Sequence, residues 1–448
     1  MKEQPAEKSY VFDKAYRDVK HTFDVTWGDT FDSAKIKKLF SNVFLFIPNL
    51  LVFLIITAFR VVLNSIISLL LIAVFLSVAP IVYIGFVTVA FIDYCYRFFG
   101  KISNVCPYCQ YKFDLPTYLC PTCGIKHTRL IPSKYGILKR KCLCGTKLPT
   151  TFFNGRQKLE GICPKCDCSL KDKETGGEQI EVCIPVIGGS SAGKTCFINM
   201  AILQLEQGVA SRLGYNFKYV PNGLNEYTDI VRGMKRGCLP EKTSEMRLKY
   251  YQFYLTYKGS RLKKLVSICD VGGEIYQDQS LIGNQIGFRY ADGFIIVVDP
   301  LSIIKYRSEL QGKVDISTYG MSTEVIDDIL SRLIITLENL HAASSKTKFK
   351  TRVAIVFTKC DIPGLDEQIG EKAVDLYVGD HNVSREQASN ILCEDFLQRY
   401  DESNFVNIIK SKFNTVQYFT CSSLGNQDGK KFKSTGVEAP IIWLLKNI

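Results

Sequence analysis

A glycine-rich stretch near the middle of the chain has the residue types and spacing of a phosphate-binding loop. Gly188 is followed by four residues and then by Gly193, Lys194 and Thr195, which is the pattern G-x-x-x-x-G-K-[ST]. In such a loop backbone N–H groups surround a phosphate, the lysine reaches the β and γ oxygens, and the threonine hydroxyl binds Mg²⁺. The predicted phosphate contacts are Gly188, Gly189, Ser190, Ser191, Ala192, Gly193, Lys194, Thr195 and Cys196.

The residues on either side of this loop determine whether the motif has chemical meaning. The β-branched apolar run Val182–Ile187 predicts a buried strand, and Cys196–Leu205 predicts a helix whose N-terminus would face an anion. A glycine-rich turn without chemical function does not require this strand–loop–helix context. The sequence therefore favours a phosphate site.

A second apolar run ends in a carboxylate. Leu265–Cys269 predicts a strand, and Asp270-Val-Gly-Gly-Glu274 follows it directly. An aspartate at the end of a strand can hold Mg²⁺ through water, and the Gly273 N–H can contact a γ-phosphate. We therefore predict that Asp270 supports the metal together with Thr195.

Three more buried strands are expected at 293–299, 353–357 and 416–420. The second ends in Thr358-Lys359-Cys360-Asp361, where the carboxylate can accept both hydrogen bonds from the N1 and N2 side of guanine. Adenine offers no such pair of donors. The third strand leads to Ser422 and Ser423, whose backbone can donate to the guanine carbonyl. Carboxyl ends of parallel strands share one edge of a doubly wound sheet, so these motifs should converge.

The cysteines suggest metal sites in a reducing compartment. Eight of the 17 cysteines fall into close pairs, and the chain opens without an apolar signal segment. Taken in order, the pairs form two consecutive quartets and predict tandem Cys₄ zinc ribbons. Disulfides are the alternative, Cys168 could replace Cys166, and His127 is interpreted as a surface histidine. The predicted zinc ligands are Cys106, Cys109, Cys120 and Cys123, then Cys142, Cys144, Cys163 and Cys166.

An apolar block precedes the cysteines. Between Val43 and Ile92 the one charged side chain is Arg60. About 20 residues cross the hydrocarbon of a bilayer, so the block predicts two membrane helices, Val43–Phe59 and Ser68–Ile92, with a turn at Arg60–Ser65. A hairpin entering one leaflet and a hairpin buried in a soluble core are the alternatives. Residues 1–42 are expected to be a solvated leader or an amphipathic helix around 12–23.

Charge along the chain gives orientation and candidate partners. Lysines before the block and Arg97 and Lys101 after it place both termini in the cytoplasm by the positive-inside rule. Of the net charge of +12, residues 93–172 carry +9, from fourteen Lys and Arg against five Asp and Glu. This basic segment, especially around Lys139-Arg140-Lys141, is expected to face anionic lipid. Nucleic-acid binding is the alternative.

Residues 180–448 resemble GTPases of the translation-factor and Ras-related (TRAFAC) class. The GKT of the loop, DVGG, TKCD and CSSL match the G1, G3, G4 and G5 motifs of that class. The resemblance implies an α/β fold, a mostly parallel sheet with helices on both faces, and binding of GTP or GDP with Mg²⁺. The order of membrane hairpin, double zinc ribbon and GTPase is also similar to bacterial proteins of this clade.

The resemblance further implies catalytic roles for Lys194, Gly273 and a switch threonine. That threonine should lie between 200 and 270; Thr243 is the candidate, with Ser244 second. Small GTPases that resemble this domain usually carry glutamine where Glu274 stands. Hydrolysis is therefore expected to be slow or to need a partner that supplies an arginine; Arg236 acting in cis is an alternative.

The expected organisation has four parts: a cytoplasmic segment 1–42, a membrane hairpin 43–92, zinc ribbons 93–172 with two Zn²⁺, and a GTPase domain 173–448 preceded by the polar linker Lys171–Glu178. The expected function is a membrane-anchored guanine-nucleotide switch with a protein effector or activator. The alternatives are a P-loop ATPase and a nucleotide-locked membrane scaffold whose ribbons bind nucleic acid or protein. The oligomeric state is left open.

Overall fold

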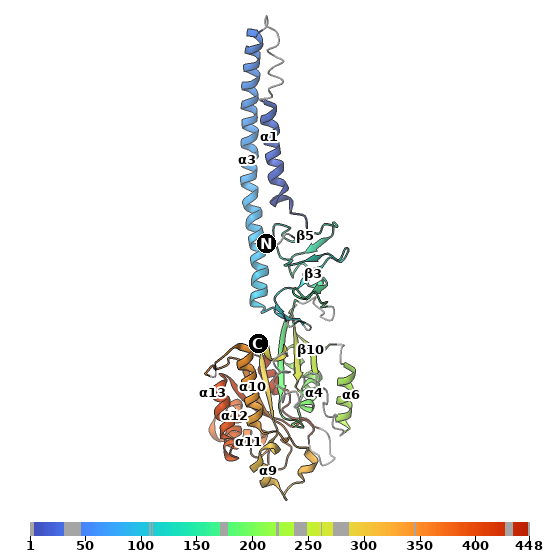
Figure 1. Ribbon diagram of the computed structural model, residues 1–448, viewed down its shortest axis with the longest axis vertical. Coiled ribbons are helices and arrows are strands. Elements are labelled where there is room, and N and C mark those ends of the chain that lie inside the picture. Colours follow the sequence, from blue (N-terminus) through green and yellow to red (C-terminus); the bar gives the residue numbers. More distant parts are fainter. Residues whose placement is uncertain are drawn as a thin grey trace. The chain divides into compact units, whose positions relative to one another are not determined.

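The computed structural model describes residues 4–30, 46–106, 109, 111–170, 178–220, 224–236, 249–260, 262–271, 286–344, 346–425 and 433–446. The chain divides into two compact units, Met1–Glu178 and Gln179–Ile448. Both units are drawn in Figure 1.

The apolar block of the first unit is one continuous helix. After the short η1 (Tyr10–Phe12) and the helix α1 (Lys14–Thr30), α3 runs from Phe46 to Phe99 over 54 residues. The prediction of two helices with a turn at Arg60–Ser65 is therefore wrong. The polar residues there are satisfied without a turn, because the Ser65 hydroxyl donates to the Val61 carbonyl at 2.7 Å and the Asn64 amide donates to the Thr26 carbonyl at 2.9 Å.

The N-terminal segment is a helix packed on α3 rather than a solvated leader. Trp27 Nε1 donates to Ser68 Oγ at 3.2 Å, and Tyr16 meets Phe75 edge-on with ring centroids 5.0 Å apart. Further along, Phe12 contacts Phe86 in the same edge-on manner. Figure 1 shows α1 running beside α3. The polar interruption in the apolar block is thus a docking point for α1.

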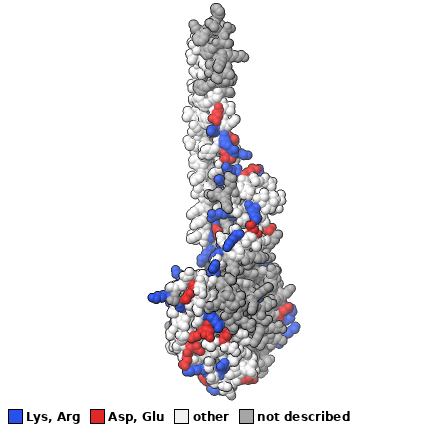
Figure 2. Space-filling view, viewed as in Figure 1, with Lys and Arg blue, Asp and Glu red and all other residues white. Residues whose placement is uncertain are grey.

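α3 keeps a large apolar surface in spite of α1. Its residues Leu50–Phe99 have a mean hydropathy of 2.7 in the most apolar window, and by length and composition this is the one helix in the described part of the chain that could cross a membrane. On the face that Figure 2 shows, most of the long helix carries no charged side chain. At 1.5 Å per residue it is about 81 Å long, well beyond the ~30 Å of a hydrocarbon core.

The cysteine-rich part is built from short antiparallel strands. β1 (Asn104–Val105) pairs with β2 (Lys112–Phe113), and β5 (Lys139–Lys141) pairs with β6 (Lys147–Pro149). Between them β3 (Thr117–Leu119) is the centre of a sheet with β4 (Lys126–His127) and β7 (Gly161–Ile162). The N-terminal residues contact this cysteine-rich part, since Ala6 forms an antiparallel bridge with Cys142.

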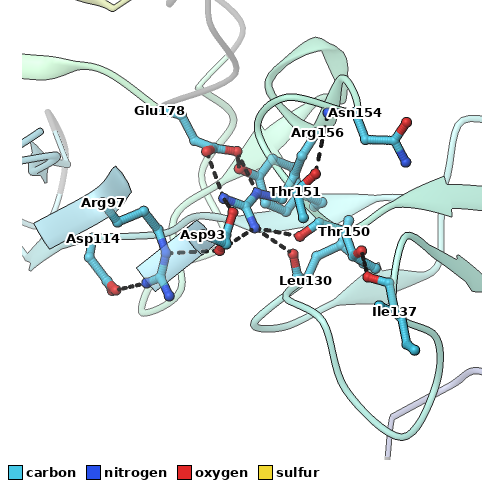
Figure 3. A network of polar contacts seen from close by, with 11 residues as sticks. Asp93, Arg97, Asp114, Leu130, Ile137, Thr150, Thr151, Asn154, Arg156 and Glu178 are labelled. Atoms are coloured by element: carbon cyan, nitrogen blue, oxygen red, sulfur yellow. Dashed lines mark hydrogen bonds and ion pairs between the residues drawn. The ribbon is translucent and has the colours of Figure 1, made fainter. Parts of the chain in front are cut away.

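A buried ionic network centres on Arg156 in η3 (Arg156–Lys158) (Figure 3). Its guanidinium forms a bidentate pair with Glu178, Nε–Oε1 at 2.7 Å and Nη2–Oε2 at 2.9 Å, and reaches Asp93 of α3 at 3.1 Å. All three side chains are at most 1% exposed. Burial opposes the charge on Arg156, but the hydrogen bonds and charge of Glu178 outweigh it and raise the arginine pKa. Arg97 extends the network by pairing with Asp93 and Asp114.

Arg140, expected on a basic surface, is also buried. It is 1% exposed, and its guanidinium donates to neutral acceptors, including the carbonyl of Arg129 at 3.1 Å. Burial lowers its pKa to about 10. Of the expected basic run only Lys139 and Lys141 are exposed, and Lys141 pairs with Glu7 at 3.0 Å.

The second unit is a seven-stranded sheet among its described residues, in the order β14-β13-β12-β8-β11-β10-β9. Five strands are parallel: β14 (Val416–Thr420), β13 (Arg352–Phe357), β12 (Gly293–Val298), β8 (Ile180–Ile187) and β11 (Lys263–Asp270). Two antiparallel strands, β10 (Lys249–Tyr257) and β9 (Tyr215–Tyr219), complete the edge. The central parallel strands β12 and β13 are almost entirely apolar, as expected for strands that are covered on both faces.

Helices cover both faces of this sheet, as the sequence predicts. One core contains side chains of α4 (Lys194–Gln204), α6 (Leu224–Lys235) and α14 (Ala439–Leu445). The other contains α9 (Ile304–Leu310), α10 (Ile326–His341), α12 (Arg385–Arg399) and α13 (Ser403–Lys412). In Figure 1 α4 and α6 lie on one side of the strands, and α10, α12 and α13 lie on the other. The remaining described helices are η4 (Leu205–Val209), α5 (Ala210–Arg212), α8 (Ile286–Arg289), η6 (Pro300–Ser302), η7 (Ile316–Tyr319) and α11 (Glu371–His381).

Candidate nucleotide site and metal centres

The glycine-rich loop connects β8 directly to α4. Gly193 adopts a left-handed conformation with φ of +87°, and Ser191 does the same at +61°. A Cβ at Gly188 would lie 2.7 Å from the Val297 carbonyl oxygen, and one at Gly189 would collide with the Ser322 hydroxyl. These contacts explain why glycine stands at both positions.

Lys194 is folded back into the loop. Its Nζ donates to the carbonyls of Gly188 and Gly189, each at 2.8 Å, and the side chain is buried. Burial lowers the lysine pKa, while the nearby charges of Asp270 and Glu324 oppose that change. The ammonium is therefore positioned at the loop centre, where a phosphate oxygen would replace carbonyl contacts.

The two predicted metal-binding side chains of the nucleotide site are hydrogen-bonded to each other. The Thr195 hydroxyl donates to Asp270 Oδ2 at 2.7 Å. Burial raises the Asp270 pKa, against the opposing effects of Lys194 and Thr195. A hard oxygen-preferring cation such as Mg²⁺ suits this pair, because it takes few protein ligands and keeps several waters. Cys196, one position further along α4, has its pKa raised by burial to about 11 and adds no charge there.

The motif after β13 contacts the glycine-rich loop. Thr358 Oγ1 donates to the Ala192 carbonyl at 2.8 Å, and Lys359 Nζ donates to the Ser191 carbonyl at 3.2 Å. The hydroxyl of Ser422, just after β14, donates to Asp361 Oδ1 at 2.7 Å; Ser423 is buried beside it. Motifs from four parallel strands thus meet at one edge of the sheet, as the sequence predicts.

Two carboxylates at this edge were not predicted. Asp299, directly after β12, is buried and binds Lys359 Nζ at 2.7 Å. Its position at a strand's end, like those of Asp270 and Asp361, is the signal that would have found it. Glu324 accepts a hydrogen bond from the Ser190 backbone N–H at 3.0 Å, and nothing in the surrounding sequence marks it.

The predicted switch residues lie outside the described residues. Thr243, its alternative Ser244, and Gly273 and Glu274 all fall in the ranges 237–248 and 272–285. Arg236 is the last described residue before the first of these ranges. Their roles stay predictions.

The eight paired cysteines form two quartets, but the grouping differs from the predicted one. The sulfur atoms of Cys106, Cys109, Cys163 and Cys166 lie within 4.8 Å of one another, as do those of Cys120, Cys123, Cys142 and Cys144. The sites are therefore nested, one inside the other along the chain, and the tandem prediction is wrong. The physical reason is that β3 pairs with β7, aligning Tyr118 with Gly161, which brings the last C-x-x-C pair back to the first.

The quartet geometry fits zinc. Cys106 and Cys166 sulfurs are 3.6 Å apart, and so are those of Cys120 and Cys144. A tetrahedron with Zn–S bonds of 2.3 Å has edges of about 3.8 Å, whereas a disulfide requires about 2.05 Å. The described cysteines are all free thiols, so the disulfide alternative is not supported.

Two further residues of the cysteine-rich part, Cys168 and His127, are not among the quartet cysteines. Cys168 lies outside the quartet that contains Cys166; its backbone carbonyl accepts from the Cys163 N–H at 2.9 Å. His127 is fully buried rather than on the surface, and neither ring nitrogen has a hydrogen-bond partner among the described residues. Burial, with a smaller effect of Arg140, lowers its pKa to about 4.

The second unit contains a match to a known protein family. Residues 182–399 match the model of the family described as Double-GTPase 2. Two similar solved structures are of the GTPase-like domain of Ski7 from S. cerevisiae, one bound to GTP and one bound to GDP and inorganic phosphate. They are 15% and 12% identical with TM-scores of 0.31 and 0.30, and the alignments cover 60% of this chain and only about half of theirs (50% and 49%). No curated protein matches the chain.

The family match, the sheet order and the loop between β8 and α4 together define an α/β P-loop GTPase-like fold.

Proposed function

We propose that this chain is a guanine-nucleotide-binding switch of the TRAFAC class, anchored to a membrane through α3, that binds GTP with Mg²⁺ and hydrolyses it slowly or with a partner. The name of the matching family, Double-GTPase 2, supports GTP as the ligand. The proposal assigns phosphate binding to Lys194 and the glycine-rich loop, and metal binding to Thr195 and Asp270.

The observation that carries the proposal is the placement of the base-selecting residues. Lys359 is bonded to the carbonyl of Ser191 in the phosphate loop, and the Asp361 carboxylate is oriented by Ser422. A carboxylate fixed there can accept two hydrogen bonds from guanine, and adenine offers no matching donors. This arrangement favours a GTPase over the alternative ATPase.

Hydrolysis would use residues that the structure does not describe. In the proposal Thr243 caps the Mg²⁺ ion, the Gly273 N–H contacts the γ-phosphate, and Glu274 stands near the attacking water. A carboxylate there repels the phosphate charge, so an arginine from a protein activator would raise the rate. GTP bound without turnover would instead favour the locked-scaffold alternative.

The two cysteine quartets are proposed to hold two structural Zn²⁺ ions. Four thiolates around each ion leave no open position for catalysis. Arg156 ties this part of the chain both to Asp93 of α3 and to Glu178, two residues before β8 begins. In the proposal the ribbons serve as an adaptor between the membrane helix and the GTPase domain.

Membrane attachment is proposed through part of α3. Hydrocarbon covers about 20 residues of a straight helix, and α1 already contacts α3 at Asn64, Ser68, Phe75 and Phe86. The charged side chains of α1 exclude it from hydrocarbon, so the proposed span lies on a stretch that α1 leaves uncovered. The zinc ribbons and the GTPase domain are proposed to be cytoplasmic.

Nucleic-acid binding has less support than the charge of residues 93–172 suggests. Arg140 and Arg156 are buried, and Arg97 and Lys141 are paired with acidic groups. Electrostatic attraction to phosphates requires exposed cations that can release counterions. Fewer basic side chains are therefore exposed and unpaired than the net charge of this segment suggests.

The full chain in lipid nanodiscs tests the proposal. Direct titration should show binding of GTP and GDP at least about a hundredfold tighter than ATP, with slow phosphate release from GTP, while matched nanodiscs without protein give neither signal. Equal affinity for the two purines, or no binding of either, would contradict the proposal. Extraction of the protein by alkaline carbonate from cell membranes would contradict the anchorage separately.

A further inference from the structure

A short segment before α10 lies across the candidate nucleotide site. We call residues 319–324 the strap. The Gly320 carbonyl accepts from Lys359 Nζ at 2.7 Å, and the Ser322 N–H donates to Asp299 Oδ2 at 2.9 Å. At its end Glu324 accepts from the Ser190 N–H in the phosphate loop at 3.0 Å. The strap thus joins the base-selecting side of the site to the phosphate side.

The Glu324 carboxylate lies where the loop would bind a phosphate anion. Ser190 is the third residue of the phosphate loop, and the backbone N–H groups of such a loop are donors for nucleotide phosphates. One of these donors, the Ser190 N–H, is hydrogen-bonded to the Glu324 carboxylate. That carboxylate and Asp270 are also the two acidic groups whose charge acts on Lys194, the lysine that would reach the β and γ oxygens.

Asp270 and Glu324 differ in the groups that partner their carboxylates. The Asp270 carboxylate is bonded to Thr195 and would face Mg²⁺, which compensates its charge. Glu324 has Arg332 of α10 near its second oxygen, at 3.5 Å. Its side chain is 12% exposed, so solvent screens it little, and its charge acts on an incoming phosphate.

We propose, on the basis of the guanine-nucleotide function above, that Glu324 is a specificity-determining residue that discriminates GDP from GTP. Its carboxylate opposes the terminal phosphate of GTP and is compatible with GDP. When GTP binds, the carboxylate leaves the Ser190 N–H and the strap moves with it.

Charge and hydrogen bonding at Glu324 can be separated by substitution. Glu324→Gln keeps an oxygen that can accept from Ser190 and removes the charge. Asp328→Asn is the matched control, because it makes the same charge change four residues along α10 at an exposed position. Arg332→Gln acts in the opposite direction, since it removes the cation that partly neutralises Glu324.

The experiment measures dissociation constants of GDP and a non-hydrolysable GTP analogue, with Mg²⁺, for the full chain in nanodiscs. Glu324→Gln should lower the dissociation constant of the analogue about tenfold and that of GDP less than twofold. Arg332→Gln should weaken binding of the analogue about threefold relative to GDP, and Asp328→Asn should change neither dissociation constant. These sizes follow from neutralising one nearby charge. Equal effects on both nucleotides, no effect, or weaker analogue binding by Glu324→Gln would overturn the proposal. If the wild-type chain bound neither nucleotide, the proposed function itself would fail.

Discussion

The Arg156 guanidinium and the Glu178 carboxylate form a bidentate pair, with N–O distances of 2.7 and 2.9 Å, in a region from which water is excluded. Glu178 belongs to the stretch that the sequence analysis interprets as a polar linker. The pair fixes the end of that stretch against the zinc-binding part of the chain, while Asp93 binds the same arginine from α3.

Replacing Arg156 should destabilise the first unit strongly. Arg156→Met leaves the buried Glu178 carboxylate without its cation and leaves Asp93 with Arg97 alone; breaking a buried ion pair in this way typically costs about 3–5 kcal/mol. The control is Lys158→Met, on the same short helix but exposed. The measurement is the denaturant midpoint for zinc release, detected with a colorimetric chelator. Adding Asp93→Asn and Glu178→Gln to Arg156→Met should recover part of the loss; unchanged midpoints in all variants would show that the network carries no stability.

Zinc stoichiometry distinguishes nested from tandem sites. Cys106→Ser with Cys163→Ser should remove one zinc per chain, because both sulfurs belong to one quartet. Cys106→Ser with Cys120→Ser should remove two. Under the tandem grouping these results would be exchanged. Metal content of the purified variants, measured by atomic emission, gives the answer directly.

Loss of the negative charge on Asp270, which accepts a hydrogen bond from Thr195, should weaken magnesium-dependent nucleotide binding. Asp270→Asn keeps the shape but removes the charge that would support the metal, and we expect the Mg²⁺ concentration for half-maximal GTP binding to rise at least about tenfold. A titration of Mg²⁺ at fixed nucleotide measures this change. If nucleotide bound in excess EDTA as tightly as it binds to the wild type with Mg²⁺, that result would argue against a metal at this position.

Asp361 should determine which purine binds. In Asp361→Asn the side chain presents an amide donor, so preference should shift from guanine to xanthine nucleotides by about a hundredfold or more. Ser422→Ala removes the hydroxyl that orients Asp361 at 2.7 Å. It should weaken GTP binding by about ten- to a hundredfold, the value of one hydrogen bond to a charged group, without changing the preference. Competition between GTP and xanthosine triphosphate measures both effects.

His127 should make the folding stability of the cysteine-rich part depend on pH. Its pKa is lowered to about 4 in the folded chain, against ~6.5 when unfolded. The stability it contributes is therefore complete above about pH 6.5 and is lost as the pH falls toward 4. The chain has four histidines, and the NMR signal of His127 is identified as the one that disappears in His127→Asn. That signal should titrate near pH 4. A midpoint near 6.5 for that signal would contradict the buried, neutral state.

The elements of the GTPase-like unit were predictable because their signals are local. Val182–Ile187 and Val353–Phe357 are continuous apolar runs of strand length, and each is followed by a motif whose chemistry requires the end of a strand. Parallel pairing then brings Thr195, Asp270 and Asp361 to one edge. No long-range information beyond the sheet order was needed.

The features that sequence analysis missed depend on contacts between distant residues. A C-x-x-C pair does not specify its partner pair, so the grouping followed the order of the chain until the β3–β7 pairing decided it. Asn64 and Ser65 look like a turn, but Asn64 is bonded to the Thr26 carbonyl, 38 residues away. Glu324 stands in an ordinary polar loop, and only its position against Ser190 distinguishes it.

The nesting of the cysteine quartets imposes an order of assembly during synthesis. Cys120 and Cys144 are 24 residues apart, whereas Cys106 and Cys166 are separated by 60. As the chain emerges from the ribosome, the inner metal cage can close while the last two outer ligands are still being translated, and the shorter loop also loses less entropy on closure. A truncated chain that ends between 144 and 163 would therefore carry one metal ion and a pair of unmatched thiols.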